Sequence, residues 1–260
     1  MTINSIFLLA PAEVARPDEG PIAFAVALAA KAGAKLTIFC VALDVTSPGS
    51  TVDAIAAGEK LMAAAAAHGV DATLVSEHSH AVGIHEVVAE HARLHDISVS
   101  GINSQGLLSE RQIAEYLMFE SGRPVLLVPS HWRGEVVTDK LCVAWDNSRS
   151  SARALSDALH VVGCDNVVFL SITDEKALAS DLDPDDMVRA ARRGGLVATT
   201  ASASLAGRDI GNALQAEAIA SGAGLLAMGA FGHSRLRSFV LGSATRGILA
   251  DLKMPVLLSH

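Results

Sequence analysis

The residues best suited to chemistry in this sequence are glycines and a serine near its C-terminal end. Gly229 and Gly232 are followed, after a gap of nine residues, by Gly242 and Ser243, which gives the spacing G-x2-G-x9-G-S. Glycine permits positive φ angles and lets the backbone approach a ligand closely. Main-chain N–H groups at the start of a helix, together with the helix dipole, attract anions. The motif therefore predicts a phosphate cradle built mainly from backbone, to which Ser243 adds a hydroxyl.

The motif lies between a predicted strand and a predicted helix. The apolar run Leu225–Met228 is typical of a buried parallel strand, and residues 244–250 are expected to begin a helix. Four matched positions in that setting are more specific than a lone Gly-x2-Gly, because glycine is common after strands. The nine-residue gap also holds His233, Arg235 and Arg237. We interpret the two arginines as part of a solvated loop rather than as phosphate ligands.

A second candidate for ligand contact is Asp146, which follows the apolar run Leu141–Trp145. A carboxylate at the C-terminal end of the first strand of a doubly wound domain lies where such domains bind ligands. Asp146, Asn147 and Ser148 are also favoured N-cap residues, so the same run suits the start of a helix. Position alone does not decide between these interpretations, and the downstream glycine motif favours contact with a nucleotide.

Several other kinds of active site are disfavoured. No G-x4-G-K-[ST] or G-x-G-x-x-G follows either first strand, which argues against a Walker-type ATPase and a Rossmann dehydrogenase, and no G-x-S-x-G suggests an esterase. His91 and His95 share a face of a predicted helix, but Ala92 stands where a metalloprotease motif needs glutamate. We therefore expect packed or half-exposed histidines rather than a metal site. No residue stands out as catalytic.

Composition and charge narrow the class of protein. The 260 residues are 50% hydrophobic and only 4% aromatic, which is typical of parallel strands covered on both faces by helices. No apolar stretch reaches the ~18 residues of a membrane helix, and no secretory signal is recognisable, so we expect a cytoplasmic protein. The net charge of −8 argues against non-specific binding to nucleic acid or anionic membranes. Cys40, Cys142 and Cys164 form no CxxC pair and are expected to be buried and unpaired.

The chain consists of two halves of the same kind. Pro124-Val125-Leu126-Leu127 recurs as Pro255-Val256-Leu257-Leu258, and each copy closes its half. Short apolar runs alternate with helical stretches, which predicts right-handed βαβ crossovers and an α/β fold with a doubly wound, five-stranded parallel sheet in each half. We predict domains at residues 1–130 and 141–260, joined by a linker at residues 131–140. The strands expected are Ile6–Leu9, Leu36–Val41, Ala72–Val75, Ile97–Val99, Val125–Val128, Leu141–Trp145, Val167–Ile172, Leu196–Thr200, Leu225–Met228 and Val256–Leu258. The helices expected include Pro21–Lys31, Val52–His68, Ile84–His95, Ser151–Val162, Pro184–Arg193 and Ile210–Ala220.

With Asp146 and the glycine motif, the sequence resembles the universal stress protein family in its tandem two-domain form. The likeness extends over the whole second half and is looser in the first. It implies a Rossmann-like fold of the adenine nucleotide alpha hydrolase type, and the glycine motif marks the ATP-binding branch of the family.

The resemblance also implies roles for particular residues. Asp146 would face the adenosine end of the nucleotide, and the backbone of Ile172 would contact adenine. Gly229 and Gly232 would line the ribose and phosphates. The phosphate tail would be held by the pair Gly242 and Ser243.

The first half departs from this pattern. Its first strand ends in Ala10-Pro11 rather than in an aspartate, and residues 100–106 after its fourth strand carry no Gly-Ser pair. We therefore expect one ATP site per chain, in the second half. In the family, domains pair through their last strands, so we predict that Val125–Val128 and Val256–Leu258 pair within one chain. The sequence does not decide whether the intact chain forms a homodimer through another surface.

These features together predict a cytoplasmic stress-response protein that binds ATP, alone or with Mg²⁺. The family includes slow ATP hydrolysis and autophosphorylation, but nothing in the sequence demands either. One alternative is an interaction or sensor module of the same fold that binds no nucleotide. Another is an adenylate-chemistry enzyme, which is the weaker alternative because neither first strand-to-helix loop carries an HxGH or SGGxDS motif.

Overall fold

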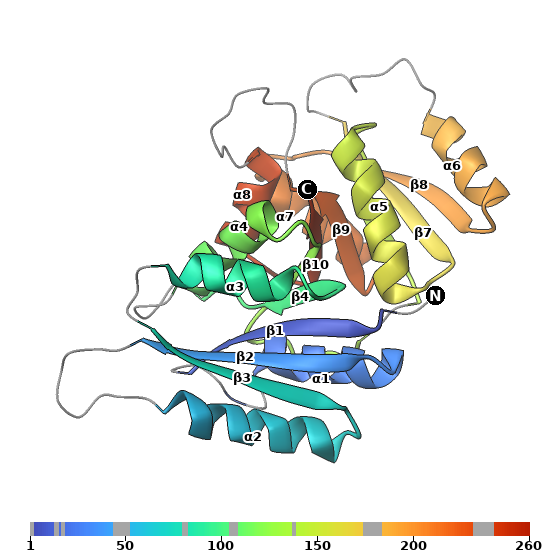
Figure 1. Ribbon diagram of the computed structural model, residues 1–260. Helices are drawn as coiled ribbons and strands as arrows, with labels where there is room; N and C mark the ends of the chain where they lie inside the picture. The colour runs from blue at the N-terminus through green and yellow to red at the C-terminus, as the bar shows by residue number, and fades with distance from the viewer. Residues whose placement is uncertain are drawn as a thin grey trace. The chain divides into compact units, whose positions relative to one another are not determined.

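The computed structural model describes residues 3–12, 16, 19–43, 53–79, 83–103, 109–136, 139–173, 184–230 and 242–260. Strands and helices alternate within each half of the chain (Figure 1). The chain divides into two compact units, Met1–Val136 and Val137–His260, and each is described by itself. The predicted linker and the predicted pairing of the last strands stay predictions.

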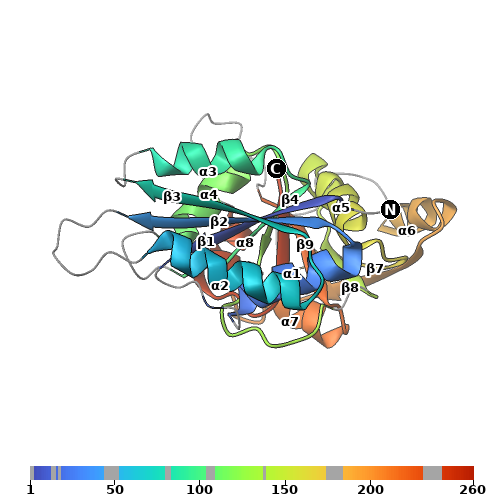
Figure 2. The same ribbon diagram turned by 60° about the horizontal axis from the view of Figure 1, so that its bottom comes forward.

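The first unit is a parallel sheet with helices on both faces. Its strands lie in the order β3-β2-β1-β4-β5. Strands β2 and β3 are added on one side of β1, and β4 and β5 on the other, so the strand order reverses between β1 and β4. Helices α1 and α2 lie on one face of the sheet, and α3 and α4 lie on the other (Figures 1 and 2). The elements are β1 (Ser5–Pro11), α1 (Gly20–Ala32), β2 (Lys35–Leu43), α2 (Ala54–Ala67), β3 (Ala72–Ser79), α3 (Ile84–Ala92), β4 (Ile97–Ser100), α4 (Glu110–Glu120) and β5 (Val125–Leu127).

The second unit repeats this topology. Its strand order β8-β7-β6-β9-β10 matches that of the first unit, and the strand order reverses between β6 and β9. Helix α5 covers β9 and β10, and α7 packs against α8. The elements are β6 (Leu141–Ala144), α5 (Arg149–Val162), β7 (Asn166–Ile172), α6 (Pro184–Arg193), β8 (Val197–Ala203), α7 (Ile210–Ala220), β9 (Leu225–Gly229), α8 (Ser243–Ala250) and β10 (Val256–Ser259).

The predicted fold class is confirmed, and all ten predicted strands are present. Most of the strands are short apolar runs because helices bury both faces of each sheet, and β4, β5 and β10 are buried along their whole length. The six predicted helices and the helix after the glycine motif are also present, with ends that differ by a few residues. Helix α4 was not among the predictions.

The cysteines and two of the histidines are packed as expected. All three cysteines are buried and none of them forms a disulfide, and burial raises the pKa of the Cys142 thiol to about 12. The ring of His91 lies against Phe39, and Nε2 of His95 lies 2.8 Å from Oγ1 of Thr37. Burial lowers the pKa of His95. None of the described helices has both the length and the apolar character needed to cross a membrane.

Candidate functional site

Three of the predicted site residues lie at one edge of the second sheet. Strand β6 pairs with β9 on one side and with β7 on the other, and all three strands are parallel. Gly229 ends β9 and Ile172 ends β7, while Asp146 follows shortly after the end of β6. Because parallel strands present their carboxyl ends at the same edge, these residues line the switch point where such sheets bind ligands.

Asp146 belongs to a tight turn between β6 and α5. Its Oδ1 accepts a hydrogen bond from the backbone N–H of Ser148 at 3.0 Å. Between them, Asn147 has φ 60°, in the left-handed region, and its Oδ1 accepts a 2.7 Å hydrogen bond from Nε1 of Trp145. The N-cap of α5 is Ser148, whose hydroxyl accepts from the N–H of Ser151. Asp146 therefore stabilises the turn. The N-cap of α5, which the sequence alone did not assign, is Ser148.

The backbone of Ile172 faces the space beyond the end of β6. The N–H of Trp145 donates to the carbonyl of Leu170, so the backbone groups of Leu170 point toward β6. Backbone direction alternates along a strand, and the groups of Ile172, two residues later, point to the same side. The pairing of β6 with β7 ends at Leu170, whereas the pairing of β7 with β8 continues to Ile172.

Gly229 is needed for packing rather than for an unusual backbone angle. A Cβ atom at this position would lie 2.5 Å from the Cβ and the Oγ of Ser150 in the first turn of α5. Gly229 has no positive φ, and Gly242 has φ −61°. The freedom of glycine to adopt positive φ angles is therefore not used at these two positions. Glycine at position 229 instead lets the N-terminal end of α5 approach the end of β9.

The start of α8 is tied to the end of β9. The hydroxyl of Thr245, which is buried in the first turn of the helix, donates to the carbonyl of Ala230 at 2.7 Å. The N–H of Ala230 in turn donates to the carbonyl of Ser259 in β10 at 2.8 Å. Gly242 is the N-cap of α8, and its lack of a side chain leaves the first turn without side-chain capping. Ser243, the first residue of the helix, is exposed.

Close contact with α7 holds α8 in this position. A Cβ atom on Gly211 would lie 2.6 to 2.8 Å from backbone atoms of Ala244, Gly247 and Ile248. At the other end of α8, the fully buried amide of Gln215 donates to the carbonyl of Asp251 at 2.8 Å and accepts from the N–H of Lys253 at 2.7 Å. The contacts with α7 and Gln215 therefore fix the position of α8, and with it the start of the helix at the candidate site.

Comparison with known proteins supports this description. Residues 138–260 match the Universal stress protein family. The second unit is a universal stress protein domain. No curated protein matches the chain in sequence.

Two solved structures share the fold across nearly the whole chain. A universal stress protein from Archaeoglobus fulgidus DSM 4304 has a TM-score of 0.69 and 17% identity, over 97% of this chain and 95% of that chain. A protein described as functionally unknown, from Pseudomonas aeruginosa PAO1, has a TM-score of 0.64 and 15% identity, over 99% of this chain and 92% of that chain. The chain therefore has the fold of two universal stress protein domains in tandem.

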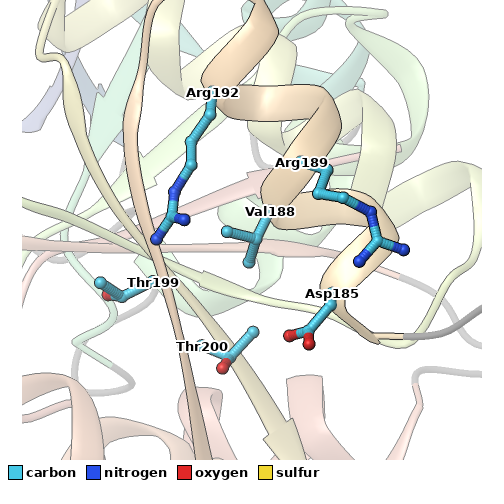
Figure 3. A pocket seen from close by; sticks show the side chains of 6 residues that line it. All are labelled: Asp185, Val188, Arg189, Arg192, Thr199 and Thr200. Atoms are coloured by element: carbon cyan, nitrogen blue, oxygen red, sulfur yellow. The ribbon is translucent and has the colours of Figure 1, made fainter.

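One cavity of the universal stress protein domain lies apart from the predicted residues. It has a volume of about 380 Å³ and lies between α6 and the edge strand β8 (Figure 3). Its lining residues are Asp185, Val188, Arg189, Arg192, Thr199 and Thr200. The guanidinium of Arg192 donates twice to the carbonyl of Ala198, and Arg189 pairs with Asp186. Both arginines are thus engaged within the domain itself.

The remaining motif residues of this domain, namely Gly232, His233, Arg235 and Arg237, lie outside the described residues. Sequence reasoning also missed residues that shape the site. Ser150 fills the space beside Gly229, and Thr245 joins α8 to the end of β9. The serine-rich run Ser148–Ser151 was the available signal for the first, whereas no local pattern marks Thr245.

Proposed function

We propose that the second unit binds ATP along the C-terminal edge of its sheet, and that the chain acts as a cytoplasmic stress-response protein. The observation that carries this proposal is the start of α8. Its first turn has no side-chain cap, its first residue carries an exposed hydroxyl, and Thr245 anchors it beside the end of β9. Free N–H groups at the positive end of a helix dipole suit a phosphate.

The described residues fit a nucleotide that runs along this edge. Gly242 and Ser243 would hold the phosphate tail, with Gly232 completing the cradle. Asp146 and the backbone of Ile172 lie on the β6 and β7 side, where ribose and adenine would bind. Bound Mg²⁺ would neutralise part of the phosphate charge. No general base or nucleophile accompanies these residues in the described part of the chain, so the proposal is a binding protein that is at most a slow ATPase.

Saturating Mg-ATP should raise the melting temperature of the second unit. A ligand at about 100 times its dissociation constant adds about 2.7 kcal/mol to the free energy of unfolding, which corresponds to roughly 5–10 °C. Differential scanning calorimetry would compare Mg-ATP with Mg²⁺ alone. Superimposable melts, together with no heat of binding in titration calorimetry, would reject ATP binding and favour a module that binds no nucleotide.

The substitution Gly242→Asp should weaken ATP binding without destabilising the chain. Asp is a better N-cap than Gly by a few tenths of a kcal/mol, and φ −61° is open to any residue. Its carboxylate would accept the first-turn N–H groups and repel the phosphates, so affinity should fall at least about tenfold. Titration calorimetry measures the affinity, and thermal melts report the stability.

Gly242→Ala is the matched control for this substitution, because it adds a Cβ atom at the same place without a charge. Ala is a poor N-cap, so this variant should be the less stable of the two while it keeps more of the affinity. Undiminished ATP binding in the Asp variant would show that the start of α8 does not hold the phosphates.

A further inference from the structure

The shared topology assigns each position at the edge of the second sheet an equivalent in the first. In the repeated Pro-Val-Leu-Leu motif, Leu127 pairs with Ser100 of β4, and Leu258 pairs with Met228 of β9. The residues that follow, Gly101 and Gly229, are therefore equivalent. The same registers, followed across β1 and β6, place Pro11 where the second unit has Asp146.

The two helix starts at this edge differ in the same way between the units. Helix α5 has Ser148 as its N-cap, whereas the equivalent helix α1 has Glu19. Helix α8 begins with Ser243, whereas the equivalent helix α4 begins with Glu110. The starts of these helices thus carry serine in the second unit and glutamate in the first.

The side chain of Glu110 packs against the carboxyl end of its sheet and does not extend into solvent. Only 4% of the residue is exposed, whereas Ser243, which begins the corresponding helix of the second unit, is exposed. Its Oε2 accepts a hydrogen bond from the backbone N–H of Asn103 at 2.8 Å. A Cβ atom on Gly101 would lie 2.5 to 3.0 Å from the carboxyl group. The carboxyl group therefore lies directly against the end of β4 and takes up a backbone N–H of the loop that follows.

We propose that Glu110 is the residue that determines which half of the chain accepts an anion, because its carboxyl group occupies in the first unit the place that a ligand phosphate takes in the second. The comparison rests on the proposed function of the second unit. Ser109 reinforces the exclusion, since its hydroxyl accepts from the N–H of Gln112 and so caps the first turn of α4. The negative charge of Glu19 acts on Glu110 and would also repel an incoming phosphate.

The test copies the residues of the second unit into the first, in the full chain. The variants are Glu19→Ser, the double variant Glu19→Ser/Glu110→Ser, and Glu19→Ala/Glu110→Ala as a second way to empty the space. The probe is inorganic tripolyphosphate at pH 8, with the number of sites measured by titration calorimetry and the fold checked by circular dichroism. Each double variant should bind one equivalent more than wild type, and Glu19→Ser alone should gain none.

The number of sites gained separates this inference from the proposed function. ATP binding by the wild-type chain reports on the second unit alone, whereas the difference between a double variant and wild type reports on Glu110, whatever the wild-type number is. Double variants that fold and bind no more tripolyphosphate than wild type would overturn the inference. A gain in Glu19→Ser alone would also overturn it, because Glu110 would then not be the residue that excludes the anion.

The reciprocal substitution Ser243→Glu transfers the carboxyl group to the second unit. Its affinity for ATP should fall at least about tenfold below that of Ser243→Ala, which removes the hydroxyl without adding charge or bulk. Equal affinities in these two variants would show that a carboxyl group at the first helical position does not compete with a phosphate.

Discussion

A chain that carries Glu110→Gln should be more stable than wild type at pH 8, by up to about 3 kcal/mol, and should lose most of this advantage at pH 4. Burial raises the pKa of Glu110 from 4.5 to about 7, and the negative charge of Glu19 adds to the effect, while the hydrogen bond from Asn103 opposes it. Each unit of pKa difference corresponds to about 1.4 kcal/mol, so the raised pKa lowers the stability of the ionised form by about 3 kcal/mol.

The direction follows from the number of protons bound in each state. Between about pH 4.5 and pH 7 the folded chain holds the Glu110 proton more tightly than the unfolded chain. The contribution of Glu110 to stability is therefore fully present below pH 4.5 and is lost as pH rises through 7. Glutamine is never ionised, and its side-chain oxygen can still accept from the N–H of Asn103, so the variant escapes this loss.

The measurement is the free energy of unfolding in urea for both proteins between pH 4 and pH 8. The difference between the proteins matters more than either profile, because His95 works in the opposite direction. Burial lowers the pKa of His95, so its contribution is present above the unfolded pKa of 6.5 and is lost as pH falls. A difference between the proteins that stays constant across this range would show that Glu110 does not titrate near neutrality.

The fold was largely predictable because parallel strands buried on both faces leave a plain signature. Short runs such as Leu225–Met228 have no polar position to interrupt them, and the repeated Pro-Val-Leu-Leu motif marks the last strand of each half. Helix α4 was not predicted because its first three residues are polar and its buried face begins with a charged residue, Glu110, ahead of Ile113, Ala114, Leu117 and Met118. Its first residue is Glu110, so the carboxyl group that lies against the end of β4 was not predicted either.

The site was only partly predictable because its geometry depends on contacts between distant segments. The motif correctly indicated that Gly229 lies at a close approach, but the approaching atoms belong to Ser150, which is far away in the sequence. Likewise, the equal suitability of Asp146 and Ser148 as N-caps could be resolved only by their hydrogen bonds. Residue types give the candidates, whereas the tertiary fold decides which hydrogen bond each one makes.

Gly211→Val should destabilise the second unit by about 3 kcal/mol and weaken ATP binding with it. A Cβ atom at this position meets main-chain atoms of α8 at 2.6 to 2.8 Å, and backbone cannot rotate away as a side chain can. Overpacking of this kind costs roughly 1–3 kcal/mol or more, and the relief available is to push α8 away from α7. That movement would also shift the start of α8, where Ser243 lies.

The matched control is Ala220→Val, which places the same side chain on an exposed position of the same helix. It carries only the lower helix propensity of valine, about 0.5 kcal/mol, and should bind ATP as wild type does. Urea unfolding measures the stabilities, and titration calorimetry measures ATP affinity on protein that is still folded. If Gly211→Val lost stability but kept its affinity, the position of α8 against α7 would not matter for the ligand. Because the fold and the proposed site depend on the same glycine contact, we expect the two losses to occur together.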